Sequence, residues 1–122
     1  MQITIPFKTP TINHLYGQHG FRKFLKPEAK ELREKIQNIC KDISIDHIKD
    51  KKLVVTTEIH EDWLTKKGEV KRKDIANREK FLIDSVFDEL DIDDKLVYVH
   101  IMRKIQDTKE FAIIKIKEHN DK

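Results

Sequence analysis

The segment from Asp74 to about Leu90 constrains the fold most, because it reads as a helix that is apolar on more than one face. Its apolar positions are Ile75, Phe81, Leu82, Ile83, Val86, Phe87 and Leu90. A helix with so much apolar surface must be largely buried against other elements. The polar residues left over fall on one side of the helix, at Asn77, Lys80, Asp84 and Asp88.

The rest of the chain supplies elements that can cover this helix. A second helix begins at Pro27, which suits a first turn, and carries apolar residues at helical spacing: Ala29, Leu32, Ile36, Ile39 and Ile43. Segments with strand character are 2–5, 52–60, 96–105 and 111–117. In the third, alternation places Val97, Val99 and Ile101 on one face. Residues 11–26 read as an irregular loop.

The order of these elements is β-α-β-α-β-β, so the sequence predicts an α+β fold with two helices packed on a mixed sheet. The length of 122 residues fits a single domain over residues 1–122. Cys40, the one cysteine, falls beside an apolar helical stripe and is expected to be a buried, inert thiol. No signal peptide or membrane-spanning run is visible, so we expect a soluble, cytoplasmic protein.

Charge gives a weaker indication of function. The net charge of +3 permits nucleic-acid binding without establishing it. Basic residues concentrate between Lys66 and Lys80, including the run Lys71-Arg72-Lys73, and again at Arg22, Lys23 and Lys26. Such runs are also typical of a solvated face. Trp63, near the start of the first run, either stacks on a base or covers the core, and we favour the core.

Acidic residues and one lysine suggest phosphodiester chemistry. Asp74 lies at a helix start, Asp93 and Asp94 precede a strand, and Lys80 lies almost two turns into the helix. Carboxylates that converge from different elements hold Mg²⁺ or Mn²⁺, and a nearby cation stabilises the transition-state charge. Each has a simpler reading too: Asp74 as a helix cap, Asp93 and Asp94 as turn formers, and Lys80 with Asp84 as an i, i+4 pair. The six histidines match no zinc-site spacing.

The pattern Asp74-Ile75-Ala76-Asn77-Arg78-Glu79-Lys80, followed by Asp84 and the Asp93-Asp94 pair, resembles RusA-type Holliday junction resolvases. The N-terminal segment adds to the resemblance, through Ile5-Pro6-Phe7, Asn13 and Tyr16 in the loop, and the helix that starts at Pro27. The resemblance therefore spans nearly the whole chain.

The resemblance implies a homodimeric, Mg²⁺-dependent endonuclease (Mn²⁺ being an alternative ion) that nicks four-way DNA junctions. By motif position it implies that Asp74, Lys80 and Asp94 are catalytic and that Asp74, Asp94 and, less directly, Asp93 bind the metal. Asn77 and Asp84 are expected to hold these catalytic side chains in position without binding the metal directly. Residues expected to contact DNA are Lys71, Arg72, Lys73, Arg22, Lys23, Asn13 and Tyr16.

One position departs from the family pattern. The second acid of the family's D-x-D motif falls on Ala76, whose side chain cannot bind a metal. Three explanations stay open: a variant that places a carboxylate elsewhere, an inactive relative, or an engineered change. Candidate replacement ligands are Glu58, His60 and Asp84. The alternative functions are a junction-binding protein without nuclease activity and, more distantly, a protein-interaction domain.

Overall fold

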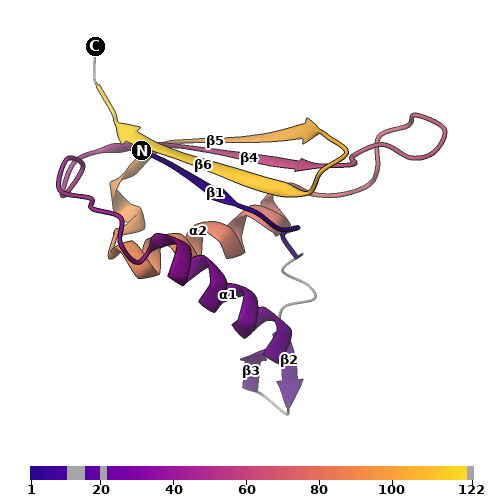
Figure 1. The fold of residues 1–122 in the computed structure, drawn as a ribbon, viewed down its shortest axis with the longest axis horizontal. Helices are drawn as coiled ribbons and strands as arrows, with labels where there is room; N and C mark the ends of the chain where they lie inside the picture. The colour runs from indigo at the N-terminus through magenta and orange to yellow at the C-terminus, as the bar shows by residue number, and fades with distance from the viewer. Residues whose placement is uncertain (11–15, 20–21, 121–122) are drawn as a thin grey trace.

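The computed structural model describes residues 1–10, 16–19 and 22–120, and both of its α-helices lie on one side of a four-stranded sheet (Figure 1). The strand order is β1 (Gln2–Ile5), β6 (Phe111–Glu118), β4 (Leu53–Glu61) and β5 (Val97–Gln106). β4 and β5 run parallel, whereas β6 is antiparallel to both β1 and β4. The predicted α+β class and mixed sheet are confirmed.

Helix α2 (Ala76–Leu90) connects the two parallel strands. Its buried side chains include Leu82 and Val86, which join the core formed by the helix-facing residues of the sheet, such as Val55 and Ile114. Burying each such side chain contributes about 1.5–3 kcal/mol. The polar stripe predicted at Lys80, Asp84 and Asp88 is exposed, as expected for the face turned away from this core.

Helix α1 (Pro27–Cys40) packs against α2 and is tied to it by an ion pair of 3.3 Å between Arg33 Nη2 and Asp88 Oδ2. It buries Ala29, Ile36 and Cys40. Burial, followed by the charge of Glu89, raises the pKa of the Cys40 thiol to about 11, so the prediction of a buried, inert thiol is confirmed. The prediction that Ile39 belongs to the buried face is wrong, because this side chain is an exposed one.

The prediction of an irregular loop over residues 11–26 is also wrong in part. β2 (Tyr16–His19) and β3 (Arg22–Leu25) form an antiparallel pair, with Tyr16 opposite Leu25 and His19 opposite Arg22. Strands of four residues with few apolar positions leave almost no period-two signal in a sequence. Backbone pairing, which composition does not reveal, defines this hairpin.

A β-bulge in β5 changes which side chains face the helices. Val97 is opposite Leu53, but the next pair is Val99 with Val54, so Tyr98 is the extra residue. Beyond the bulge His100 is opposite Val55, a buried residue on the helix side of β4. The prediction that Val97, Val99 and Ile101 share one face is therefore wrong. Val97 and His100 face the helices instead.

Neither α1 nor α2 combines the length and apolar character that a membrane-spanning helix requires, and no other helix in the described residues does.

Candidate active site

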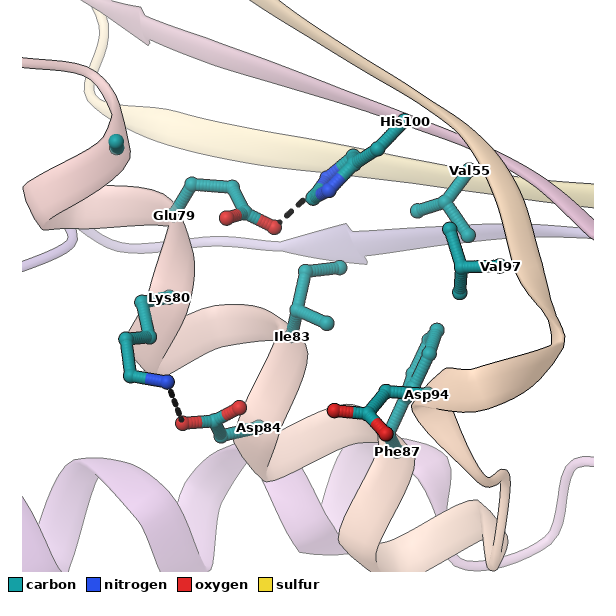
Figure 2. Close-up of a pocket in the computed structure, with 10 residues that line it drawn as sticks. Val55, Glu79, Lys80, Ile83, Asp84, Phe87, Asp94, Val97 and His100 are labelled. Carbon is teal, nitrogen blue, oxygen red and sulfur yellow. Dashed lines mark ion pairs between the residues drawn. The ribbon is translucent and has the colours of Figure 1, made fainter.

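A cleft of about 390 Å³ lies between α2 and β5, and we call it the α2–β5 cleft (Figure 2). One helical face, the start of β5 and the short 3-10 helix η2 (Asp94–Leu96) form most of its wall. Its lining residues are Val55, Ala76, Glu79, Lys80, Ile83, Asp84, Phe87, Asp94, Val97 and His100.

Three of the predicted site residues, Lys80, Asp84 and Asp94, come together in this cleft. Lys80 Nζ lies 3.5 Å from Asp84 Oδ2, which confirms the i, i+4 pair, and both side chains are more than half exposed. Asp94 comes from the other side of the cleft, on η2 (Figure 2). A cation and two carboxylates therefore share one solvent-accessible surface.

The two residues of the Asp93-Asp94 pair have different surroundings. Asp93 caps η2, because its Oδ1 accepts a hydrogen bond of 3.0 Å from the backbone N–H of Lys95. Its other oxygen lies 3.7 Å from Lys95 Nζ. The turn-forming interpretation of Asp93 is confirmed, whereas Asp94 lines the cleft.

Asp74 lies outside the lining of the cleft. Its Oδ1 accepts a hydrogen bond of 2.9 Å from the N–H of Ala76, the first residue of α2, although the N-cap position itself is Ile75, which has no side-chain cap. Asp74 precedes the 15 residues of α2 and Asp94 follows them. Asp74 is therefore placed at the start of α2, outside the set of residues that line the cleft with Asp94.

The donor set limits how a metal ion can be held. Within the described ranges no group of three or more His, Cys, Asp or Glu side chains is arranged to hold one. Asp84 and Asp94 supply two carboxylates, which fits an ion such as Mg²⁺ that keeps several waters and shares phosphate oxygens. It does not fit an ion enclosed by protein ligands alone. Ala76, at the position of the second motif acid, lines the same cleft.

Two of the three candidates to replace the missing acid are wrong. Glu58 and His60 alternate with the buried residues of β4 and lie on the sheet face away from the helices. Glu58 pairs with Lys115 at 3.2 Å, and His60 stacks on Phe111 and contacts Asp107. The backbone N–H of Lys109 and, after it, the contact with His60 lower the pKa of Asp107. Only Asp84 of the three reaches the cleft.

A second pair in the cleft, Glu79 and His100, was not predicted. Glu79 is only 6% exposed, and its Oε1 lies 2.9 Å from His100 Nε2 (Figure 2). Burial, helped by the charge of Asp84 and opposed by that of Lys80, raises the pKa of Glu79 to about 7. Burial lowers the pKa of His100, because it disfavours the charged imidazolium. A carboxyl group that titrates near neutrality in a cleft is a candidate for acid–base chemistry.

The family model described as Endodeoxyribonuclease RusA matches residues 6–117. The chain belongs to the RusA endodeoxyribonuclease family. No curated protein matched the chain.

The basic loop of this RusA-family chain, residues 71–73, is largely engaged with the protein itself. Lys71 Nζ donates a hydrogen bond of 3.1 Å to Asp62 O, and Lys73 Nζ pairs with Glu61 Oε2 at 3.0 Å. Arg72 is exposed and, among the described residues, has no ion-pair partner. Of the three predicted phosphate contacts, Arg72 is thus the one most available to a DNA backbone.

Trp63 is buried next to the basic loop. It is 4% exposed, its Nε1 donates a hydrogen bond of 3.0 Å to Ile59 O, and the cations of Lys73, Arg78 and Lys104 lie over its ring. The core interpretation of Trp63 is confirmed. Other predicted contacts have no described environment: Asn13 lies outside the described residues, as do the side chains of Tyr16, Arg22, Lys23 and Asn77.

Proposed function

We propose that this RusA-family protein is a metal-dependent endonuclease that binds four-way DNA junctions and nicks opposed strands in recombination or repair. The proposal rests on one observation above the others: Lys80, Asp84 and Asp94 share a cleft in a chain whose family is that of an endodeoxyribonuclease. A two-fold homodimer would present two equivalent clefts to a nearly two-fold junction, so that paired nicks follow.

In this proposal Asp84 and Asp94 hold Mg²⁺ or Mn²⁺, with Asp93 placed to support the loop that carries Asp94. The bound ion supplies polarisation of a phosphoryl oxygen and activation of water. Lys80 contributes a positive charge at the mouth of the cleft, where negative charge develops on the phosphate as the bond breaks. Asp84 holds the Lys80 ammonium at 3.5 Å and so limits the positions it takes.

Asp74 remains a proposed ligand on the strength of the family motif. The hydrogen bond to Ala76 uses one carboxylate oxygen of Asp74, and the other has no hydrogen bond among the described residues. Phosphate contacts are proposed for Arg72, with Lys71, Lys73, Arg22, Lys23, Asn13 and Tyr16 as further contacts. Recognition that depends on such contacts weakens steeply as salt rises.

A second candidate function is a junction-binding protein without nuclease activity. What favours it is Ala76, which lines the cleft at the position of the motif acid and leaves it with fewer carboxylates. Substrate binding requires the basic surface but not this acid, so binding and cleavage separate in such a protein.

Purified protein incubated with a labelled four-way junction and Mg²⁺ or Mn²⁺ tests both candidates. The endonuclease is expected to make symmetric nicks that disappear in Asp94→Asn and persist in Glu89→Gln, a matched loss of one carboxylate on the exposed side of α2 outside the cleft. Binding without nicking would favour the second candidate. A protein that neither binds nor nicks the junction would contradict both.

A further inference from the structure

We propose that Glu79 and His100 act as one unit that accepts the proton of the attacking water in the α2–β5 cleft. The proposal deepens the nuclease function above and rests on it. It assigns a role to two residues that the motif resemblance does not include.

The first support is geometric. Glu79 comes from the first turn of α2 and His100 from β5, and Oε1 of one lies 2.9 Å from Nε2 of the other. Among the described residues, Oε1 has no partner at hydrogen-bonding angles, although it is shielded from water. The second carboxylate oxygen has no hydrogen bond either in the described chain, so it stays available to a water molecule in the cleft.

The second support is the desolvation cost of burying the Glu79 carboxylate. A carboxylate that is 6% exposed beside Ile83, Val55 and Val97 loses hydration that apolar neighbours do not replace. An apolar side chain at the same helix position would avoid that cost. Costly polar groups that line a cleft are commonly found where their chemistry is used.

The charges around the pair suit proton transfer near neutral pH. The groups that face it are Lys80 and Asp84 on α2 and Asp94 on η2, while β4 contributes only the apolar Val55 to the cleft. Burial is the main cause that raises the pKa of Glu79 to about 7. Because the two groups are in contact, the proton belongs to the pair rather than to one residue. A base with such a pKa is both available and strong enough at neutral pH.

The chemical step balances without a further reactant. A water oxygen forms a bond to phosphorus while the bond from phosphorus to the leaving sugar oxygen breaks. The Glu79–His100 pair takes one proton from the water, and the leaving oxygen takes one proton, from solvent or returned by the pair. No electron is transferred to or from an outside group.

The position of the pair also relates to Ala76. Glu79 follows Ala76 by three residues, about one helical turn, and both line the cleft. The chain therefore retains an acidic group on the same side of α2 as the position where the family motif places its second acid. In this proposal that group moves a proton instead of binding a metal.

The test is the pH dependence of junction nicking under single-turnover conditions, with the junction saturated by protein. For the wild-type protein the rate is expected to rise with pH through a midpoint near 7. Glu79→Gln and His100→Gln should each lower the rate by roughly 100-fold or more at pH 8 and shift or abolish this midpoint. Glu79→Asp, which keeps a carboxyl group, should retain part of the wild-type rate and still show a rise of the rate with pH. Glu89→Gln, on the exposed side of α2, is the matched control.

Junction affinity and thermal unfolding, measured on the same variants, separate a chemical role from a structural one. Unchanged junction affinity in variants that stay folded across the assayed pH range, together with the loss of the pH-dependent rise in rate, supports the proposal. An unchanged pH profile in both variants would overturn it while leaving the nuclease function intact. A wild-type protein that does not nick would contradict the nuclease function itself, and this proposal with it. Loss of Mn²⁺ binding in Glu79→Gln, measured calorimetrically without DNA, would show a metal ligand and so also overturn it.

Discussion

Arg78 on α2 and Glu61 on β4 form a buried ion pair, with Arg78 Nη1 3.2 Å from Glu61 Oε1. Lys73 approaches the other carboxylate oxygen of Glu61 at 3.0 Å, and Arg78 also donates a hydrogen bond to the carbonyl oxygen of Thr9. These contacts tie the end of β4 to the basic loop and to the first turn of α2. The orientation of α2, and with it the position of Lys80, depends on this buried cluster.

Removing one partner of the buried pair should be strongly destabilising. In Arg78→Ala, Glu61 keeps only Lys73 as a neutralising cation, so we expect the free energy of unfolding to fall by about 3–5 kcal/mol. Chemical denaturation measures the loss. The comparison is Lys8→Ala, which breaks an exposed ion pair with Glu110 at 3.2 Å and should cost less than about 1 kcal/mol. Equal effects of the two substitutions would contradict the assigned role of the cluster.

Arg72 and Lys73 are neighbours with different expected roles, and alanine substitution separates them. Arg72→Ala should leave the unfolding free energy unchanged and reduce the slope of log affinity against log salt by about 1, because one phosphate contact is lost. Lys73→Ala should instead lower stability, because the buried Glu61 carboxylate loses a partner at 3.0 Å. Filter-binding titrations across a salt series, with thermal unfolding in parallel, measure both. A larger salt-slope change for Lys73→Ala than for Arg72→Ala would reverse this assignment.

Much of the fold was predictable because its elements carry regular patterns. The apolar spacing of α2 and the alternation in β4 depend on burial against a single layer, which the sequence records directly. The hairpin β2–β3 and the bulge at Tyr98 were not predictable in this way. Both are decided by backbone pairing, which leaves little trace in the pattern of apolar residues.

The residues of the candidate site were likewise predictable only where the sequence carries a regular pattern. Lys80, Asp84 and Asp94 were predicted from motif spacing, and the structure brings them into one cleft. Glu79 was missed even though its spacing of four from Ile75 and three from Leu82 places it on the buried face of α2. That position was a usable signal: a charged residue where the helix pattern requires an apolar one. His100 offered no such signal, because the bulge that turns it toward the helices is invisible in the sequence.

Restoring an acid at position 76 should strengthen metal binding. Ala76 is exposed and lines the cleft, so an aspartate there adds a carboxylate without displacing core side chains. We expect Ala76→Asp to bind Mn²⁺ roughly 10-fold more tightly or better, measured by calorimetry, and to nick four-way junctions faster at low metal concentration. Ala76→Asn, similar in size but uncharged, is the control. If Ala76→Asp and Ala76→Asn behave alike, position 76 is not a metal-binding position in this chain.

The raised pKa of Glu79 predicts a specific dependence of stability on pH. The folded protein binds a proton at this carboxyl up to about pH 7, whereas the unfolded chain loses it near the ordinary value of 4.5. Folding therefore takes up a proton between these values, so the contribution of Glu79 to stability is largest below pH 4.5 and is lost as pH rises through 7. A shift of this size corresponds to about 3 kcal/mol, at about 1.4 kcal/mol per pH unit. Glu79→Gln cannot titrate, so its unfolding free energy relative to wild type should increase by up to that amount between pH 4.5 and 8.

Urea denaturation across this pH range measures the difference in unfolding free energy, with Glu89→Gln as the control for the loss of one negative charge from α2. Parallel stability curves for wild type and Glu79→Gln would mean that Glu79 is ionised in the folded protein throughout, and that the cleft solvates it better than its burial indicates.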